Sequence, residues 1–298
     1  MKFKSDGYTE KKFNHAEKKI FIEHFFVNYQ KVMISYAKAS GGVGYGSASA
    51  SLALGLEEIE DDQLQQMTNR YYKNFTAQLE AKGFSILTPE EAIKYKYLQG
   101  SDLNPGGKPS MDALAPGYLT TLPEGYTQIA KKSNPFDFAG VSVSNSMEGM
   151  IVARVNITVP FAVSQDINGG PVGGVAKIKA QADLRLSPSE SVPVQGDFKK
   201  PKTCMTKITF AYKKSLKWQA FYDGDLKTPL EIEGVLDEDT KYKSTSVSNS
   251  SSSLWIQDAY SDNVVMVPCD ADKYEKGVDM AVNQYMNAAL EGFLENID

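Results

Sequence analysis

The chain has 298 residues, of which 42% are hydrophobic and 23% are charged. These fractions are typical of a globular protein with its own core, and they exclude wholesale disorder and a membrane-embedded bundle. The formal net charge of -5 excludes a nucleic-acid binder, which needs a basic surface to contact phosphates.

The N-terminal residues bear on where the protein is found. Met1 to Gly7 are polar and lack the apolar stretch of a signal peptide. No apolar run reaches the ~20 residues that a transmembrane helix needs. A polar start that leads into a strand is what remains after an export signal is removed. A periplasmic or secreted location is favoured if such a signal has been removed, and the location is otherwise open.

The first expected element is a strand. Residues 18–30 are rich in β-branched and aromatic side chains and are apolar on both sides of the pleat, as in the interior of a sheet. The tract 37–53 consists mainly of small residues, which favours a flexible loop. Its glycines, from Gly41 to Gly46, do not match the spacing of a phosphate-binding loop, so we assign them no anion site.

The clearest helix begins at Asp61 or Asp62 and ends at Gly83. Apolar residues recur at helical spacing between these limits: Leu64, Met67, Tyr71, Phe75 and Leu79. Residues 84–87 form a short strand. Thr88 and Pro89 then supply the cap and the first position of another helix.

The next segment predicts little regular structure. Residues 99–135 are dense in Gly, Pro and Ser, which indicates an irregular insertion over the surface with short helical turns. Residues 140–144 resemble the turn that carries a catalytic serine, but Ser144 stands where that turn requires glycine. Because His15 and His24 are the only histidines, we interpret residues 140–144 as another strand.

Two adjoining stretches alternate polar and apolar residues with strand period. They cover residues 151–163 and 176–186, with a turn-rich connection at 166–174. We predict a long antiparallel β-hairpin that buries one face. Each strand exceeds the ~9 to 11 residues that cross a bilayer, so a hairpin that enters a membrane is an alternative. A soluble sheet is preferred because aromatic residues are missing at both ends and helices are available to cover the apolar face.

The remaining elements complete the expected fold. Further strands are predicted at 204–212, 217–222, 230–235, 253–257 and 264–267. A last helix begins at Asp270 or Asp272, and its apolar stripe contains Tyr274, Val278, Val282, Tyr285, Ala289 and Phe293. We predict a mixed α/β (α+β) fold in a single domain over 1–298, with a mostly antiparallel sheet, a long β-hairpin, two amphipathic helices on one face and an insertion at about 99–135.

No residue pattern identifies a metal or catalytic centre. Cys204 and Cys269 lack the spacing of metal ligands, and they could be two buried thiols or a disulfide. We interpret Asp223 and Asp225 as a turn, and likewise 237–239, whereas 270–272 is expected to cap a helix. The sequence therefore predicts no catalytic residue, no metal and no cofactor.

The order of these elements resembles two bacterial envelope families, the curli-secretion lipoprotein and the N-terminal domain of the Tol-translocation β-propeller protein. The resemblance rests on Lys18 to Ile22, the helix from Leu64 to Leu79, Gly83 to Leu87, and Asp183 to Leu186. It covers about half of the chain and consists of arrangement rather than a diagnostic motif. The lipid-carrying cysteine of the first family has no counterpart near Met1. Membership implies a non-enzymatic envelope protein that forms oligomers.

Three functions follow as hypotheses. The first is a non-catalytic envelope protein that acts through protein contacts, as a homo-oligomer or with a protein partner, in assembly or transport; peripheral membrane association is compatible with it. The second is a small-molecule binding module with a pocket between the sheet and loops, where Tyr45, Tyr118 and Tyr126 supply amphipathic walls. The third is a hydrolase whose carboxylates are dispersed along the sequence.

Overall fold

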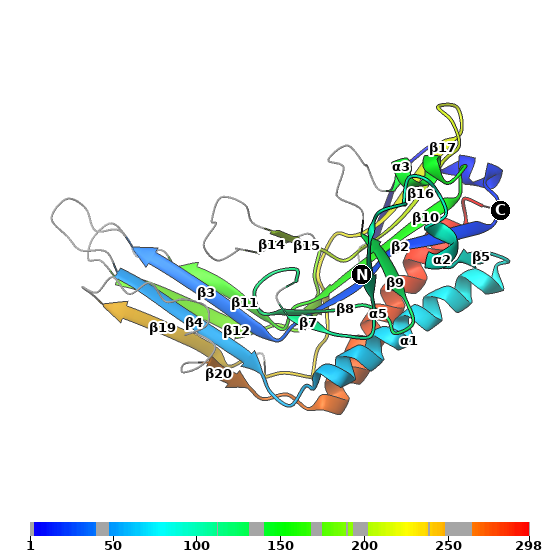
Figure 1. Ribbon diagram of the computed structural model, residues 1–298. Helices are drawn as coiled ribbons and strands as arrows, with labels where there is room; N and C mark the ends of the chain where they lie inside the picture. Colours follow the sequence, from blue (N-terminus) through cyan, green and yellow to red (C-terminus); the bar gives the residue numbers. More distant parts are fainter. Residues whose placement is uncertain are drawn as a thin grey trace.

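The protein has a mixed α/β fold with mostly antiparallel sheets. The computed structural model describes residues 3–39, 48–111, 113–130, 140–167, 175–188, 190–192, 202–237, 239–247 and 264–297. In Figure 1 these residues form a compact body and a long arm of strands that projects from it. The coarse fold class expected from the sequence is therefore confirmed.

An eight-stranded sheet is the centre of the body. Its strands lie in the order β1 (Phe3–Tyr8), β17 (Gln219–Leu226), β16 (Lys207–Lys213), β10 (Ile151–Val159), β2 (Lys19–Gln30), β8 (Tyr118–Thr121) and β7 (Ser110–Met111), and β5 (Ser85–Leu87) also pairs with β2. The two central strands, β2 and β10, are parallel neighbours. Both are almost entirely buried, which explains why the sequence of β2 is apolar on both faces.

Two long helices lie side by side on one face of this sheet (Figure 1). They are α1 (Asp61–Ala81) and α5 (Ala271–Leu294). The apolar stripe predicted for each helix is buried in the same core as β2, β10 and β16. At its centre the rings of Phe293 and Phe210 stack with centroids 3.6 Å apart. No helix among the described residues is both long and apolar enough to cross a membrane.

Shorter elements complete the body. The helices are η1 (Glu10–His15), α2 (Pro89–Ala92) and α3 (Val141–Ser146). The strand pairs are β6 (Asp102–Pro105) with β9 (Thr127–Ala130), β13 (Arg185–Leu186) with β18 (Leu230–Glu231), and β14 (Glu190–Val192) with β15 (Lys202–Cys204). The predicted caps are confirmed where they are local: Thr88 forms a capping box with Glu91, and Asp270 accepts from the backbone N–H of Lys273.

The predicted hairpin is wrong for most of its first strand. Residues 151–159 form β10, which pairs with β2 and β16 in the body. Only the following strand, β11 (Ala162–Ile167), pairs with β12 (Val175–Ala182) in an antiparallel hairpin. The predicted second strand, 176–186, is likewise wrong at its end, because residues 185–186 form β13 and pair with β18. Pro160 separates the two strands and has no N–H to donate, so the ladder of β10 ends there and the chain enters a second sheet.

Three other predictions require correction. The tract 37–53, expected as a loop, contributes to β3 (Val32–Ala39) and β4 (Ala48–Leu56), which form an antiparallel hairpin. Residues 140–144 begin α3 rather than a strand, because Gly140 has a φ of 81° and starts the helix. The segment 99–135 is not wholly irregular, since β8 within it pairs with β2. The strand expected at 253–257 lies outside the described residues.

Candidate functional site: the arm and its junction with the body

The arm consists of two three-stranded sheets that face each other. One has the order β20 (Val264–Val267), β4, β3, and the other has the order β11, β12, β19 (Lys241–Val247). Small and aliphatic side chains such as Ala50, Ala180 and Ile178 are buried between them and join the core of the body. The hydroxyls of Ser35 in β3 and Ser164 in β11 lie 2.5 Å apart across the interface. The arm is thus a small sandwich continuous with the body's core.

Both sheets begin as direct continuations of the central strands of the body. Only Lys31 separates β2 from β3, and only Pro160 and Phe161 separate β10 from β11. The pairing offset is nearly preserved, because Asn28 pairs with Thr158 (158 - 28 = 130) and Ser35 contacts Ser164 at a separation of 129 residues. The two parallel neighbours therefore part at the junction and enter opposite sheets of the arm.

Polar groups at the junction compensate the backbone atoms that leave the body sheet. The side-chain carbonyl of Gln30 accepts from the N–H groups of Phe161 and Ala162, at 3.1 and 3.3 Å. The carbonyl of Gly117 accepts from the N–H groups of Lys31 and Val32. Gly117 has a φ of 79°, and a Cβ there would lie 1.9 Å from the Val32 carbonyl oxygen, so only glycine fits. The four N–H groups at the point of divergence are therefore bonded within the protein.

Lys31 also ties the junction to the first helix. Its ammonium donates to the carbonyl of Ile59 at 2.7 Å and pairs with the carboxylate of Asp61 at 2.6 Å. Asp61 is the first residue of α1, where a negative charge is favourable. Lys31, the one residue between β2 and β3, therefore anchors the start of α1.

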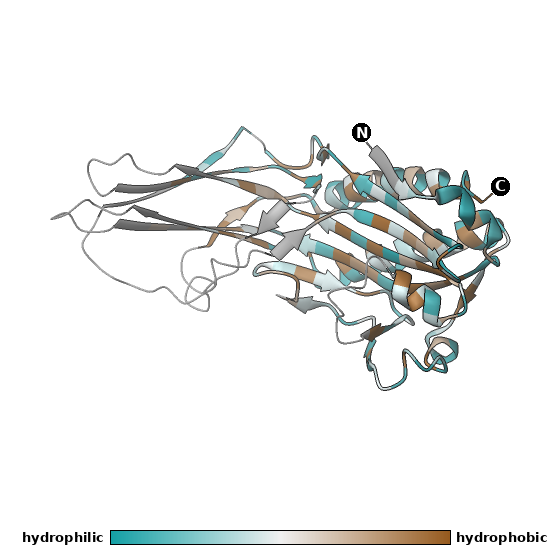
Figure 2. Ribbon diagram, turned by 90° about the horizontal axis from the view of Figure 1, so that it is seen from above, coloured by the Kyte–Doolittle hydropathy of each residue, from teal (hydrophilic) through white to brown (hydrophobic). Residues whose placement is uncertain are grey.

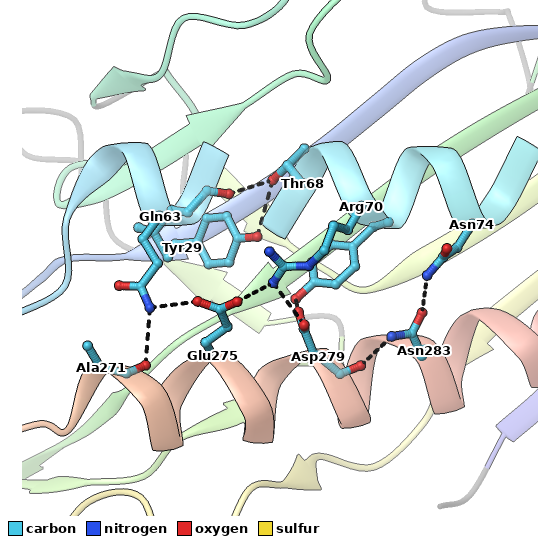
Figure 3. A network of polar contacts seen from close by, with 11 residues as sticks. Tyr29, Gln63, Thr68, Arg70, Asn74, Ala271, Glu275, Asp279 and Asn283 are labelled. Carbon is cyan, nitrogen blue, oxygen red and sulfur yellow. Dashed lines mark hydrogen bonds and ion pairs between the residues drawn. The ribbon is translucent and has the colours of Figure 1, made fainter. Parts of the chain in front are cut away.

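The other side of the arm enters the body through a second parallel pair. β4 and β20 are parallel neighbours, and each leads through a short turn into α1 and α5 respectively. The two helices then run in the same direction. A ladder of side-chain contacts links them: Gln63 to Glu275, Arg70 to Asp279 and Asn74 to Asn283 (Figure 3), followed by Gln78 to Asn287. Paired residues of β4 and β20, such as Leu54 and Val265, are 211 positions apart in the sequence. The residues of the last three rungs are 209 apart. The two helices therefore continue nearly the same alignment as the two strands that precede them.

The charged rung of this ladder is the best connected. One guanidinium nitrogen of Arg70 contacts Glu275 at 2.7 Å and Asp279 at 2.8 Å. The hydroxyl of Tyr71 donates to the same Asp279 at 2.6 Å. Burial, with the neighbouring Tyr29 and Asp279, raises the pKa of Tyr71 well above its usual range, which keeps that hydroxyl protonated as a donor. Arg70 is 42% exposed, so the rung fixes helix register more than it adds stability.

A shallow cavity of about 430 Å³ lies where the two turns meet, lined by Glu57, Glu58, Pro268, Cys269, Asp270, Ala271 and Asp272. Cys269 is a free, buried thiol, so it forms no disulfide with Cys204. Burial, followed by the charges of Asp270 and Glu58, raises the pKa of the Cys269 thiol to about 12. The thiol is therefore protonated at neutral pH and is a poor nucleophile.

This assignment predicts slow alkylation of Cys269. In a Cys204→Ser background, iodoacetamide at pH 8 should label the folded protein at least about tenfold more slowly than the urea-unfolded chain, because thiolate is the reactive form. The ordinary pKa of a thiol is 9.0, and that of folded Cys269 is about 12. Between these two pH values the thiol loses its proton only in the unfolded chain, so the contribution of Cys269 to the stability of the fold decreases as pH rises. Mass spectrometry measures the labelling rates. Equal rates in the folded and unfolded chains would contradict the raised pKa of Cys269.

The structure places the predicted ligand-binding tyrosines as follows. Tyr118 and Tyr126 are 3% and 4% exposed and belong to separate hydrophobic clusters, and Tyr45 lies outside the described residues. The Tyr126 hydroxyl donates to the carbonyl of Glu23 at 2.8 Å. The cavity described above is lined by other residues. The ligand-binding role of the three tyrosines stays a prediction.

The turn predicted at Asp223 and Asp225 is wrong, whereas the turn predicted at 237–239 is confirmed. Asp223 and Asp225 lie within β17 and not in a turn. Asp237 does form a turn, in which its carboxylate accepts from Asp239 N and the Thr240 hydroxyl. In the described part of the chain, no group of three or more His, Cys, Asp or Glu side chains is placed to hold a metal ion.

Neither the arm nor the helix ladder was predicted from the sequence. A signal for the ladder exists, since polar residues recur every four positions at 70, 74 and 78 and again at 279, 283 and 287. Comparisons with protein-family models, with curated proteins and with solved structures find no match for this chain. The geometry of the arm and of its junction with the body is therefore the basis for inferring a function.

Proposed function

We propose that the protein acts without catalysis, through protein contacts, and that the arm makes those contacts. The element-order resemblance suggests assembly or transport in the bacterial envelope as the setting. The body, in which α1 and α5 cover one sheet face, serves as the rigid base. The observation that carries the proposal is the arm itself: two small sheets that project beyond the body (Figures 1 and 2), each with an outer strand on either side among the described residues.

The edges of the arm suit pairing with another chain. In the described residues β3 and β20 are the outer strands of one sheet, and β11 and β19 are those of the other. An outer strand offers unpaired N–H and C=O groups, which are a template for a further strand. Edges that must stay single are protected by charges or proline. β19 carries Lys241 and Lys243, whereas β20 has neither charge nor proline.

β20 is the edge most ready to accept a partner. Val265 and Met266 are 44% and 47% exposed, although the strand is short and apolar. Met266 lies over Gly55 of β4, which leaves an apolar surface across both strands. Adding a strand here would bury these side chains and bond the backbone at the same time.

Light scattering after size-exclusion chromatography tests the proposal. We expect the purified chain to form oligomers whose mass rises with concentration. Met266→Lys should raise the dissociation constant about tenfold or more, because it puts a charge on the pairing edge. Met280→Lys is the matched control, since Met280 is 69% exposed on α5 and far from the arm edge.

A monomer at every concentration, with no protein partner recovered by crosslinking, would refute the proposal. An equal loss of association in both lysine variants would assign the effect to net charge and would also remove the arm from the mechanism.

A further inference from the structure

The end of the body opposite the arm carries a second exposed surface. It consists of η1 with Thr9, together with the turn between β16 and β17, and Figure 1 shows both at the far end from β3 and β12. Two hydrogen bonds fix them to each other: the Thr9 hydroxyl donates to Gln219 O at 2.6 Å, and the Lys12 ammonium to Lys217 O at 2.8 Å. We call residues 9–15 and 213–219 the basic tip.

The basic tip has the opposite charge to the protein as a whole. Five lysines belong to it: Lys11, Lys12, Lys213, Lys214 and Lys217. Acidic residues close to them include Glu10 in η1 and Glu148, whose neighbour Gly149 is so near Lys214 that an added Cβ would lie 2.8 Å from the Lys214 Cβ. A local excess of lysine stands out in a chain of net charge -5. The tip is therefore suited to an anionic partner.

An exposed apolar side chain lies in the turn between Lys214 and Lys217. Leu216 is 84% exposed, the highest value among the exposed large hydrophobic residues of the described chain. The turn that carries it is well ordered by hydrogen bonds, because Lys214 N donates to Trp218 O and Trp218 N donates to the Ser215 hydroxyl. Leu216 is thus held outward by a closed turn with a charge on either side.

An aromatic ring forms the base of the turn. The Trp218 ring packs against His15 with centroids 4.1 Å apart, and the Lys217 ammonium lies 5.0 Å from its centre. Tryptophan prefers the boundary between water and lipid, where its ring is apolar and its N–H stays polar. Lysines around an exposed leucine and a tryptophan match what binds at such a boundary: charges for anionic headgroups and an apolar group for the acyl region.

We propose that the basic tip binds the surface of a membrane that contains anionic lipids, with Leu216 entering the headgroup region. This inference is independent of the arm and of the protein contacts proposed above. It places the arm on the side of the molecule that faces away from that membrane. The shared chemistry of all five lysines is attraction to phosphate or carboxylate, and the leucine selects lipid over a soluble anion.

Vesicle co-sedimentation with the full chain tests this inference. The vesicles contain phosphatidylcholine alone or phosphatidylcholine with phosphatidylglycerol. The variants are Lys214→Glu/Lys217→Glu and Leu216→Ser, and the charge-matched control is Lys73→Glu/Lys276→Glu on the exposed faces of α1 and α5. Lys217→Glu gives up the contact of the Lys217 ammonium with the Trp218 ring, so circular dichroism on heating checks that each variant keeps its fold.

We expect binding only to vesicles with phosphatidylglycerol. The tip double variant should bind at least about 30-fold more weakly, since each lysine at an anionic surface contributes roughly a fivefold factor. Leu216→Ser should lose about tenfold or more, and this loss should persist in high salt, which screens only the lysines. The control should retain most of the binding.

Three results of the vesicle experiment would overturn the inference. They are equal binding to both kinds of vesicle, an equal loss in the tip and control variants, and wild-type binding by Leu216→Ser. Tight binding to polyglutamate without binding to vesicles would assign the tip to an acidic protein segment and would overturn it as well.

Discussion

Arg154→Met should destabilise the protein by about 3 to 5 kcal/mol, because it leaves a buried carboxylate without its partner. Arg154 and Glu23 are neighbours on β10 and β2, and they form two contacts of 2.7 and 3.2 Å. The Glu23 side chain is only 8% exposed, and His24 lies 3.7 Å from it. Urea unfolding at pH 7 measures the loss.

A double variant shows whether the cost comes from the orphaned charge. Glu23→Gln/Arg154→Met should recover a large part of the lost stability, since no charge then remains buried. Lys19→Met provides the exposed comparison: its ion pair with Glu17 has side chains 55% and 74% exposed, and its removal should change stability far less than Arg154→Met does. A small effect of Arg154→Met alone would contradict the buried pair.

Phe293→Ala should lower the free energy of unfolding by about 3 to 5 kcal/mol. The Phe293 ring is fully buried near the end of α5, where it stacks on Phe210 and meets the edge of Phe13 at 5.2 Å. Its removal leaves a cavity between the helix and the sheet and loses the aromatic contacts.

The control for this prediction is Met280→Ala on the exposed side of the same helix. That change should stay within about 0.5 kcal/mol, because Met280 is 69% exposed. Equal effects of the two substitutions, measured by thermal unfolding, would mean that α5 does not dock on the sheet as described.

Local physics made part of this fold predictable from the sequence. The stripes of α1 and α5 follow the helical period, and the cap at Thr88 needs only residues within one turn. These features do not depend on distant partners. The same holds for β2, whose apolar side chains on both faces fit only the interior of a sheet.

The arm could not be predicted in the same way, because its strands depend on partners far along the chain. Residues 48–53 alternate Ser, Ala and Leu, and they form a strand because β3 pairs with them along their whole length. Pro160 marks where β10 ends, but the alternation continues past it, so the period alone gives one long strand. The pairing of Arg70 with Asp279 likewise joins residues 209 apart.

The continuity of β4 and β20 with α1 and α5 has a mechanical consequence. Tension along the arm would load the strand pair and the helix ladder in shear, with every rung bearing force at once, rather than peeling the rungs apart in turn. A partner that binds the arm and pulls on it would therefore transmit the force to the whole body.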